Sequence, residues 1–245
     1  MRSFTSLLFT LFLTTTLSAQ LGIKAGVTLG GTYGSAEELE GDKIESIDPA
    51  VGYQFGLTTQ LVDLPAFALN VELLYEDRRG VKAVDFSIQP GPDQGIRSSV
   101  EFKNSFRYLS LPVLASFGGD GLNVYVGPSF SYLLGATANT TNITTFTTIA
   151  GDNTVTSEEE IDFIDDDRYD DPYINRFNLA LNAGVMLPIL PKLSLDVRLY
   201  HTLTDVTNDE EDRSIIDRIT RPQDIRLRDD NDSTVGLQAN LVVRF

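Results

Sequence analysis

The C-terminal segment 234–245 alternates strictly between two kinds of side chain, and this pattern constrains the fold more than any other feature. One parity is apolar, and the other holds glycine, glutamine, asparagine and arginine, with only Val242 breaking the rule. Successive side chains of a β-strand point to opposite faces, so the segment is predicted to be a strand with one apolar face. A strand of this kind that ends on the aromatic Phe245 is typical of the closing strand of a transmembrane barrel.

Earlier segments repeat the same alternation, and their polar parity is rich in glycine, asparagine, serine and threonine. A narrow barrel interior requires such small or polar side chains. The further predicted strands are 21–33, 51–61, 67–75, 108–117, 122–134, 177–187 and 193–201. With the C-terminal strand they predict an all-β fold, an eight-stranded antiparallel up-and-down transmembrane β-barrel.

Some residues break the alternation within these strands. Leu74 and Leu114 fall on the inward parity although they are large and apolar. Pro112 and Pro128 lack the N–H group that an interior strand donates to its neighbour. Folding the hairpin about its glycine-rich turn brings the two prolines close together, so we predict a defect in the ladder there, in the form of a bulge.

The connections between the predicted strands are of two kinds. Those after the second, fourth and sixth strands are short, whereas the others run through 34–50, 77–105, 136–173 and 202–233. Short periplasmic turns and long extracellular loops are characteristic of outer-membrane barrels. Long loops are unusual in a compact soluble domain, which disfavours a lipocalin-like carrier. The Thr-rich stretch 137–148 is β-prone and is expected to extend its hairpin beyond the membrane.

Aromatic side chains mark both ends of the predicted strands, as the girdles of a lipid-facing band do. The loop-side set is Tyr33, Tyr53, Tyr75, Tyr132 and Phe177, and the turn-side set is Phe67, Phe117 and Phe245.

Residues 1–19 are predicted to be a signal peptide, and 20–245 the outer-membrane barrel domain. The apolar run 7–17 follows Arg2 and precedes a Ser-Ala-Gln cleavage pattern, and it is shorter than the roughly 20 residues of a membrane helix. A buried N-terminal helix is the alternative. The chain has no cysteine, which excludes disulfides and thiolate metal sites.

Charged residues on the inward parity predict a polar network inside the barrel. These residues are Lys24, Glu72, Asp196, Arg198 and Arg244, accompanied by Gln54, Asn70, Asn178, Asn182 and Gln238. The interior of an eight-stranded barrel is just wide enough for side chains to fill. The network is therefore expected to be a structural plug, with a gated ion path as the alternative.

Two further features of the sequence could be chemical sites. His201 is the single histidine and lies on the lipid parity near the outer rim, where a lipid A-modifying barrel enzyme would need a serine beside it. Its neighbours are threonine and leucine, so a headgroup contact is expected instead. Acidic runs at 158–160, 165–167, 170–171 and 209–212 could collect divalent cations but lack the spacing of a dedicated calcium loop.

The net charge of −16 argues against a nucleic-acid partner, whose phosphates require Lys and Arg. Outer-membrane lipid and lipopolysaccharide are the expected partners, no cofactor is expected, and no protein partner is predicted. Most acidic residues lie in the four long loops. We therefore expect a non-enzymatic barrel with acidic extracellular loops that serve surface interaction or envelope structure.

Three stretches resemble a known family. GIKAGVTLGG after the predicted cleavage site, RYLSLPVLASF and NVYVGPSFSYLLG resemble the outer-membrane β-barrel domain family of Bacteroidota that includes the PorT-like proteins. The resemblance covers nearly the whole mature chain and implies an eight-stranded barrel in the outer membrane. It also implies, as an alternative function, an accessory role in protein secretion or gliding, although the long acidic loops depart from that role. It supplies no catalytic residue.

Overall fold

The computed structural model describes residues 20–39, 41–64, 66–91, 93–118, 121–164, 173–212, 214, 223, 225–228 and 231–245, so the predicted signal peptide lies outside the described residues. Every regular element in these ranges is a β-strand. The strands are β1 (Gln20–Tyr33), β2 (Glu38–Leu39), β3 (Asp42–Lys43), β4 (Glu45–Leu64), β5 (Phe67–Gly91), β6 (Gln94–Gly118), β7 (Asn123–Thr148), β8 (Gly151–Asp162), β9 (Phe177–Leu190), β10 (Leu193–Thr202) and β11 (Ser233–Arg244). The described residues include no helix with the length and apolar character to cross a membrane.

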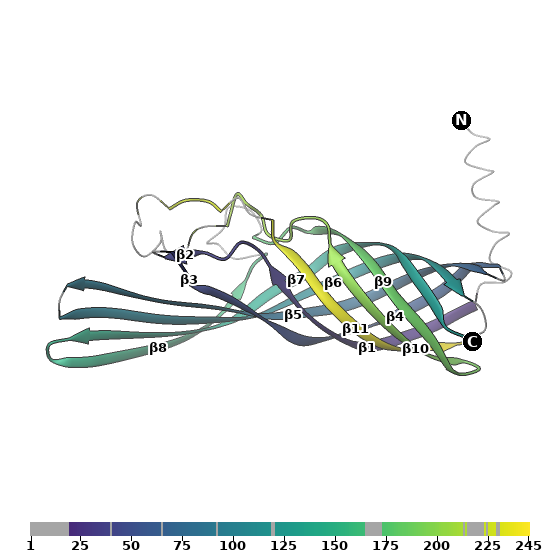
Figure 1. Ribbon diagram of the computed structural model, residues 1–245, viewed down its shortest axis with the longest axis horizontal. Helices are drawn as coiled ribbons and strands as arrows, with labels where there is room; N and C mark the ends of the chain where they lie inside the picture. Colours follow the sequence, from purple (N-terminus) through teal and green to yellow (C-terminus); the bar gives the residue numbers. More distant parts are fainter. Residues whose placement is uncertain are drawn as a thin grey trace, which may run out of the picture.

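Eight of the strands close into a ring, which confirms the predicted fold. Their order is β6-β5-β4-β1-β11-β10-β9-β7, and pairing between β6 and β7 closes the ring (Figure 1). All pairings are antiparallel. β8 lies outside the ring and pairs with β7, while β2 and β3 form a small separate hairpin.

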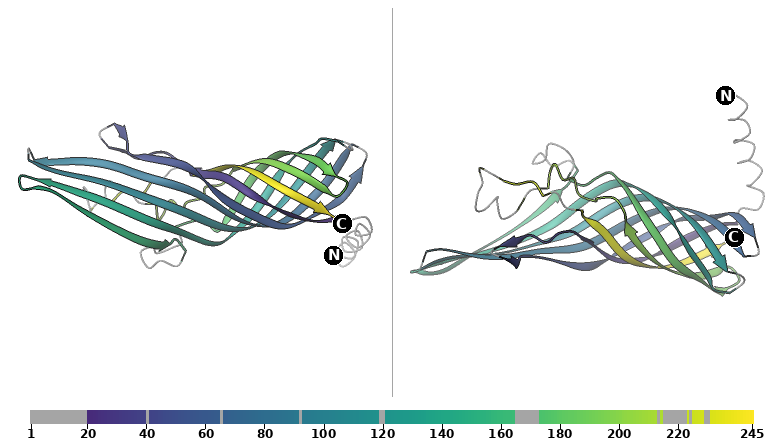
Figure 2. Two further views of the ribbon diagram at one scale, coloured as in Figure 1. Left: turned by 90° about the horizontal axis from the view of Figure 1, so that it is seen from below. Right: turned by 45° about the horizontal axis from the view of Figure 1, so that its top comes forward.

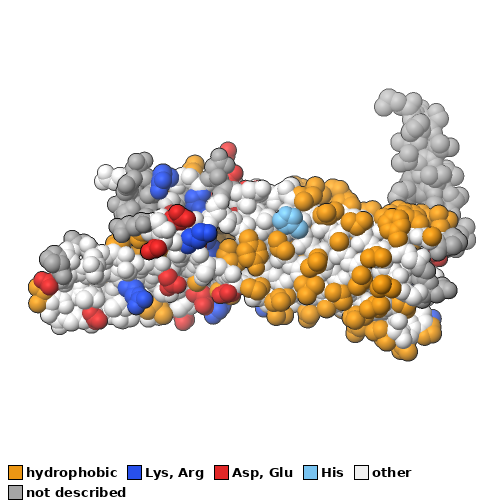
Figure 3. Space-filling view, viewed as in Figure 1, with side chains coloured by type: hydrophobic (Ala, Val, Ile, Leu, Met, Phe, Trp, Pro, Cys, Tyr) orange, Lys and Arg blue, Asp and Glu red, His pale blue; other side chains and the backbone are white. Residues whose placement is uncertain are grey.

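The ring is polar inside and apolar outside, as the alternation predicts. On β1, Ile23 and Val27 are 49 % and 52 % exposed, whereas Lys24 between them is fully buried. Figure 3 shows the outer side chains as a continuous apolar band over one half of the molecule, with charged side chains gathered on the other half. Such a band is unfavourable in water and suited to hydrocarbon, because a lipid bilayer solvates apolar side chains.

One end of the barrel holds the short connections, which follow β4, β6 and β9 (Figure 2). We call this the turn end and the opposite one the loop end. The N–H of Phe245 donates to the carbonyl of Leu21 at 2.9 Å, so the start of β1 and the end of β11 lie together at the turn end. This arrangement agrees with the predicted placement of short turns and long loops.

Two of the predicted loops are largely β-structure. β5 continues to Gly91 and β6 begins at Gln94, so most of 77–105 is a long hairpin rather than a loop. β7 extends to Thr148, as expected for the Thr-rich stretch, and β8 returns along it through a turn at Gly151, which has a φ of 118°. The loop prediction was wrong because it ended each strand where the outward side chains stop being apolar, and a strand surrounded by water has no such requirement.

The hairpins together form what we call the loop-end sheet, which projects beyond the ring (Figure 2). It consists of residues 45–49 of β4, 77–91 of β5, 94–107 of β6, 135–148 of β7 and all of β8.

The structure shows where the residues that break the alternation or the strand ladder lie. Leu74 and Leu114 are buried inside the barrel, as their parity predicts. The β6–β7 ladder has no pairs between Pro112–Ser129 and Ala115–Val126, which confirms the predicted defect. The register is unchanged across this gap, so the predicted bulge is wrong. The register shift of this hairpin lies instead at Arg107/Tyr108, nearer the loop end.

Aromatic side chains gather at both ends of the apolar band. At the loop side, the rings of Tyr53 and Tyr75 are 6.2 Å apart, and those of Tyr132 and Phe177 are 5.1 Å apart. At the turn end, Phe67 and Phe117 lie opposite each other with ring centroids 5.6 Å apart. These pairs are the aromatic girdles that the sequence predicts.

Candidate functional site

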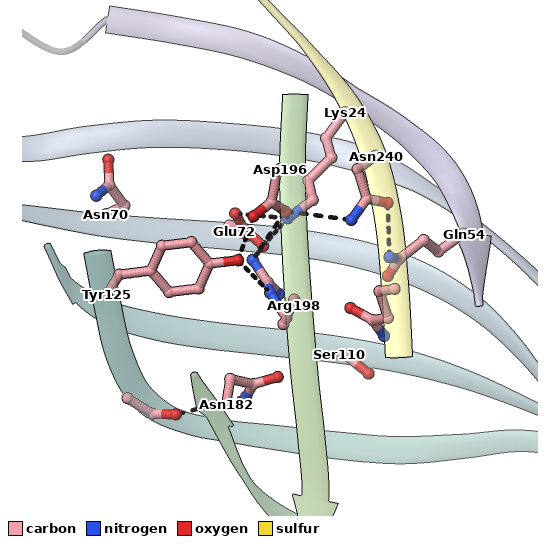
Figure 4. Close-up of polar contacts among 12 residues, drawn as sticks. Lys24, Gln54, Asn70, Glu72, Ser110, Tyr125, Asn182, Asp196, Arg198 and Asn240 are labelled. Carbon is pink, nitrogen blue, oxygen red and sulfur yellow. Dashed lines mark hydrogen bonds and ion pairs between the residues drawn. The ribbon is translucent and has the colours of Figure 1, made fainter. Parts of the chain in front are cut away.

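Four of the five charged residues predicted to face inward meet at one level of the barrel (Figure 4). The Lys24 ammonium lies 3.1 Å from the Glu72 carboxylate and 2.5 Å from that of Asp196. The Arg198 guanidinium lies 2.8 Å from Glu72 and 3.6 Å from Asp196. All four side chains are almost completely buried. Two positive and two negative groups thus form a compact neutral cluster, which we call the lumen ion cluster.

Polar side chains extend the cluster and fix its geometry. Tyr125 donates its hydroxyl hydrogen to Asp196 and accepts from Arg198 Nε at 3.0 Å. Asn240 donates to Asp196 at 3.1 Å and accepts from Gln54 at 2.6 Å. Each carboxylate therefore has several donors, as buried charges require in a low-dielectric interior.

Arg244 does not join this cluster. Its side chain is only partly buried, and its Nη2 donates to the sulfur of Met186 at 3.2 Å. It lines a polar cavity of about 260 Å³ that also contacts Asn70 and Ser116 at the turn end. The alternation predicts that Arg244 faces inward, but it does not predict how far along the barrel axis the residue lies. Arg244 is in the last pair of the β1–β11 ladder, so its side chain lies at the turn-end mouth of the barrel.

The remaining predicted polar residues have varied partners. Asn70 donates to Ser116 at 2.7 Å, and Gln238 donates to Glu76 at 3.3 Å. Asn182 contacts the carbonyl of Gly127 at 3.5 Å. Both polar side-chain atoms of Asn178 are buried without a partner among the described residues.

A second charge layer, which the sequence reasoning missed, lies nearer the loop end. Arg78 donates to Glu76 through Nε at 3.0 Å, and Ser110 donates to the same carboxylate at 2.8 Å. The Arg78 guanidinium also lies 4.7 Å and 4.8 Å from the ring centroids of Tyr108 and Tyr200. The alternation of 67–75 continues through both residues, so extending that strand would have placed Glu76 and Arg78 inside.

An apolar cluster closes the lumen at the turn end. Leu114, Tyr125, Met186 and Val242 pack together and are buried. Met186 also lines the turn-end cavity and Tyr125 contacts Asp196, so the apolar cluster lies between that cavity and the lumen ion cluster. The interior is thus filled by neutral charge layers and apolar side chains.

The loop-end sheet has a core of its own. Phe106 and Ile161 on its inner face form a buried cluster with Tyr108 and Phe163, which lie just beyond the sheet, and Ile174 and Val206 pack against this cluster from later segments. Beside this core lies a cavity of about 290 Å³, which we call the loop-end cavity. Nothing in the sequence reasoning predicted it, because its walls come from segments far apart in the chain.

An ion-pair network ties the loop-end segments together. Glu45 lies 2.9 Å from the Lys82 ammonium and 3.0 Å from the Arg228 guanidinium, and it joins β4, β5 and the segment before β11. Burial by itself would raise the pKa of Glu45. The two cations outweigh burial and lower its pKa below the ordinary value.

The other candidate residues lie apart from these sites. His201 is exposed at the edge of the apolar band (Figure 3), paired in the sheet with Leu181 and Val235. The acidic run 158–160 lies on β8, whereas 165–167 and 170–171 fall outside the described residues. Within the described ranges, no group of three His, Cys, Asp or Glu side chains could hold a metal ion.

Comparisons with known proteins agree with this architecture. The family model described as outer membrane protein beta-barrel domain matches residues 16–208. A search of curated protein sequences finds no match.

Several solved structures are similar to this chain. Neisserial surface protein A is 12% identical with a TM-score of 0.43, and the alignment covers 93% of this chain and 99% of that one. Ail of Yersinia pestis, in complex with the heparin analogue sucrose octasulfate, is 11% identical with a TM-score of 0.37, over 94% and 100%. OprG of Pseudomonas aeruginosa is 12% identical with a TM-score of 0.35, over 93% and 96%. The family model covers most of the chain, and the protein therefore belongs to the outer membrane protein beta-barrel domain family, as a β-barrel of the outer membrane.

Proposed function

We propose that this protein is a non-enzymatic outer-membrane barrel whose loop-end sheet binds a partner protein at the cell surface by strand addition. The single observation that carries the proposal is the position of β8. This strand pairs with β7 alone among the described residues and forms the outer edge of the loop-end sheet. Exposed strand edges present backbone donors and acceptors, and an extended segment of another protein can pair with them.

The side chains of β8 restrict which partner fits. Every residue of Gly151–Glu160 is exposed, and Asp152, Glu158 and Glu160 make the strand acidic. A second copy of this chain would bring like charges face to face, which is unfavourable across paired strands. A basic extended segment would bring opposite charges together. The acidic edge therefore favours a basic partner over self-association.

The filled lumen supports a role outside the membrane. The lumen ion cluster and the Glu76–Arg78 layer occupy the interior with internally paired charges. An ion or solute path would need these buried groups to separate, and each separation leaves an uncompensated charge. The barrel then serves as the membrane anchor of the sheet, with outer-membrane lipid and lipopolysaccharide as its surroundings.

Binding of designed peptides tests strand addition directly. The protein in lipid nanodiscs is titrated with a peptide of alternating Lys and Val, and with a copy in which proline replaces alternate valines. Proline removes backbone donors and leaves the charge unchanged. We expect the first peptide to bind at least about tenfold more tightly, because only it can pair with β8. Equal binding of the two peptides would show that only charge is recognised.

Charge-reversal variants locate the binding edge. Glu158→Lys/Glu160→Lys should weaken binding of the alternating peptide by about tenfold. Glu38→Lys/Asp42→Lys makes the same charge change in the exposed β2–β3 hairpin and should leave binding nearly unchanged. If both variants weaken binding equally, the peptide responds to the general field of the acidic surface, and the assignment to β8 is wrong.

The PorT-like relationship is a second proposal, supported by the resemblance of GIKAGVTLGG, RYLSLPVLASF and NVYVGPSFSYLLG. In this second proposal, the partner protein is a component of a secretion or gliding machinery. Cross-linking in native membranes followed by mass spectrometry tests it. If the parent protein is cross-linked to secretion subunits that are absent from the cross-linked products of the Glu158→Lys/Glu160→Lys variant, these subunits bind at β8. That result would support both proposals.

A further inference from the structure

The loop-end cavity lies outside the membrane band, between the loop-end sheet and the segments that pack on its inner face. Its volume of about 290 Å³ is at the lower end of the range for small-molecule sites. Phe102, Phe106 and Phe163 supply aromatic surface to its wall, with Ile161, Ile174 and Val206 as aliphatic neighbours. The site is therefore sized for a small, mostly apolar molecule rather than for a peptide or a sugar chain.

The aromatic wall is well ordered by its own packing. The rings of Phe106 and Phe163 are 6.4 Å apart, and those of Phe163 and Tyr173 are 5.1 Å apart. Phe163 also donates its N–H to the carbonyl of Ala136 at 3.0 Å, which fixes its backbone to β7. Aromatic surfaces held in place offer large contact areas without further loss of side-chain freedom, and they favour planar ligands.

One polar atom in the wall is left without a partner. Asn104 lies between Phe102 and Phe106 on the same face of β6 and lines the cavity. Its Oδ1 is buried and accepts no hydrogen bond from the described residues. A buried acceptor without a donor is unfavourable by about 1–3 kcal/mol. A ligand that brings one N–H or O–H donor would remove that penalty.

Every charged group of the cavity wall already has a partner. Asp212 lies 3.8 Å from the Arg228 guanidinium, and Asp232 accepts a hydrogen bond from Thr207 at 3.0 Å. The Lys82 and Arg228 cations both lie on Glu45, at 2.9 Å and 3.0 Å. A charged ligand would have to displace one of these pairs, whereas a neutral ligand would leave them intact. The charge pattern therefore favours an uncharged molecule.

From these observations we infer that the loop-end cavity binds an uncharged planar aromatic molecule carrying a single hydrogen-bond donor, of the indole or phenol class, with the donor on Asn104. This inference does not depend on strand addition at β8, because the cavity and the acidic edge use different residues. The two proposals can fail separately.

Indole and indene form the matched probe pair, because indene has nearly the same shape and lacks the N–H. The chain contains no Trp, so it adds nothing to indole fluorescence excited beyond the tyrosine band, and empty nanodiscs supply the background of the scaffold protein. Equilibrium dialysis measures indene. Empty nanodiscs of the same lipid correct both for partition into the bilayer. The protein in nanodiscs should bind indole about 5-fold to 150-fold more tightly than indene. This range is the roughly 1–3 kcal/mol of the unpaired acceptor converted to a ratio of dissociation constants.

Two variants and one control complete the test. Asn104→Leu should remove the preference for indole while still binding indene. Ala36→Phe, in the loop that lines the cavity, should reduce binding of both probes, and Thr154→Leu on the exposed β8 should change neither. Heat-modifiable migration on gels checks that each variant is folded. Indole uptake equal to that of empty nanodiscs overturns the inference, and so does a preference for indole that survives in folded Asn104→Leu.

Discussion

The same strand, β5, passes through two regions of the molecule that follow different rules. Within the barrel, Glu72 and Leu74 are buried between strands whose outer side chains meet lipid. Beyond the barrel, Val84 is buried on the inner face of the loop-end sheet, while the neighbouring outward side chains of Asp85 and Ser87 meet water. The barrel thus hides polar groups and exposes apolar ones, and the loop-end sheet does the reverse. The membrane region is specified by its solvent, whereas the outer region is specified by packing between distant segments.

Removal of one partner from the lumen ion cluster should produce the largest effect. Arg198→Ala leaves Glu72 and Asp196 with less compensation in the fully buried interior, so we expect the free energy of unfolding to fall by about 3–5 kcal/mol. Urea titration of the protein in lipid vesicles measures this change.

Arg79→Ala is the matched control. Arg79 pairs with Asp77 at 2.6 Å, but its own side chain is 46% exposed, and the buried Asp77 keeps the hydrogen bond that Ser105 donates at 2.7 Å. The loss should therefore be about 1–2 kcal/mol, clearly below that of Arg198→Ala. If both variants lose the same stability, the interior of the barrel is wetter than its paired charges indicate, and the contrast between the two regions fails.

Charges placed on exposed apolar positions should distinguish the two solvents. Leu73 on β5 and Val155 on β8 are 46% and 51% exposed, which is nearly equal. Leu73→Arg should lower the free energy of unfolding by about 2–4 kcal/mol, because the guanidinium enters hydrocarbon. Val155→Arg should change it by less than about 0.5 kcal/mol, because the residue meets water. Similar effects at both positions, measured by the same urea titration, would contradict the placement of the membrane band.

Acidification should destabilise the packing of the loop-end segments, with a smaller effect than the substitutions above. The pKa of Glu45 is lower in the folded protein than its ordinary value of 4.5, so its ion pairs stabilise the fold above that value. This stabilisation is lost as the pH falls through the lowered pKa. Hydrogen exchange of 225–228, corrected for intrinsic rates, should therefore rise in acid. Glu45→Gln should show the faster exchange at neutral pH already, and a variant indistinguishable from the parent would refute this role.

The barrel could be predicted well from the sequence because alternate residues of each strand face two different environments, lipid outside and a polar interior. That contrast places Lys24, Glu72, Asp196 and Arg198 on one face, and neighbouring strands bring them to one level. The contrast does not predict the position of a residue along the barrel axis. Arg244 was therefore grouped with the lumen ion cluster, although it lies at the turn-end mouth. Lipid contact on this strand ends at Tyr75, and the apolar alternation ends with it, so Glu76 and Arg78 were not predicted to face inward.

The alternation of apolar and polar residues could not predict the loop-end sheet or its cavity. Both faces of β8 meet water from Gly151 to Glu160, so this part of the sequence has no apolar alternation to recognise. The cavity combines residues of the β1–β2 loop, β6, β8 and the segments before β9 and β11, and only the folded sheet brings them together. Turn residues such as Gly151 were available as a local signal for the β7–β8 hairpin.

Planar-bilayer recording of the purified protein tests the central claim most directly, because it measures whether the interior is filled. The paired charges of the lumen ion cluster, the Glu76–Arg78 layer and the apolar cluster at the turn end predict no stepwise conductance at any applied voltage. Stable ohmic steps that change in size in the Arg198→Ala variant would show an open path through the barrel and contradict the account.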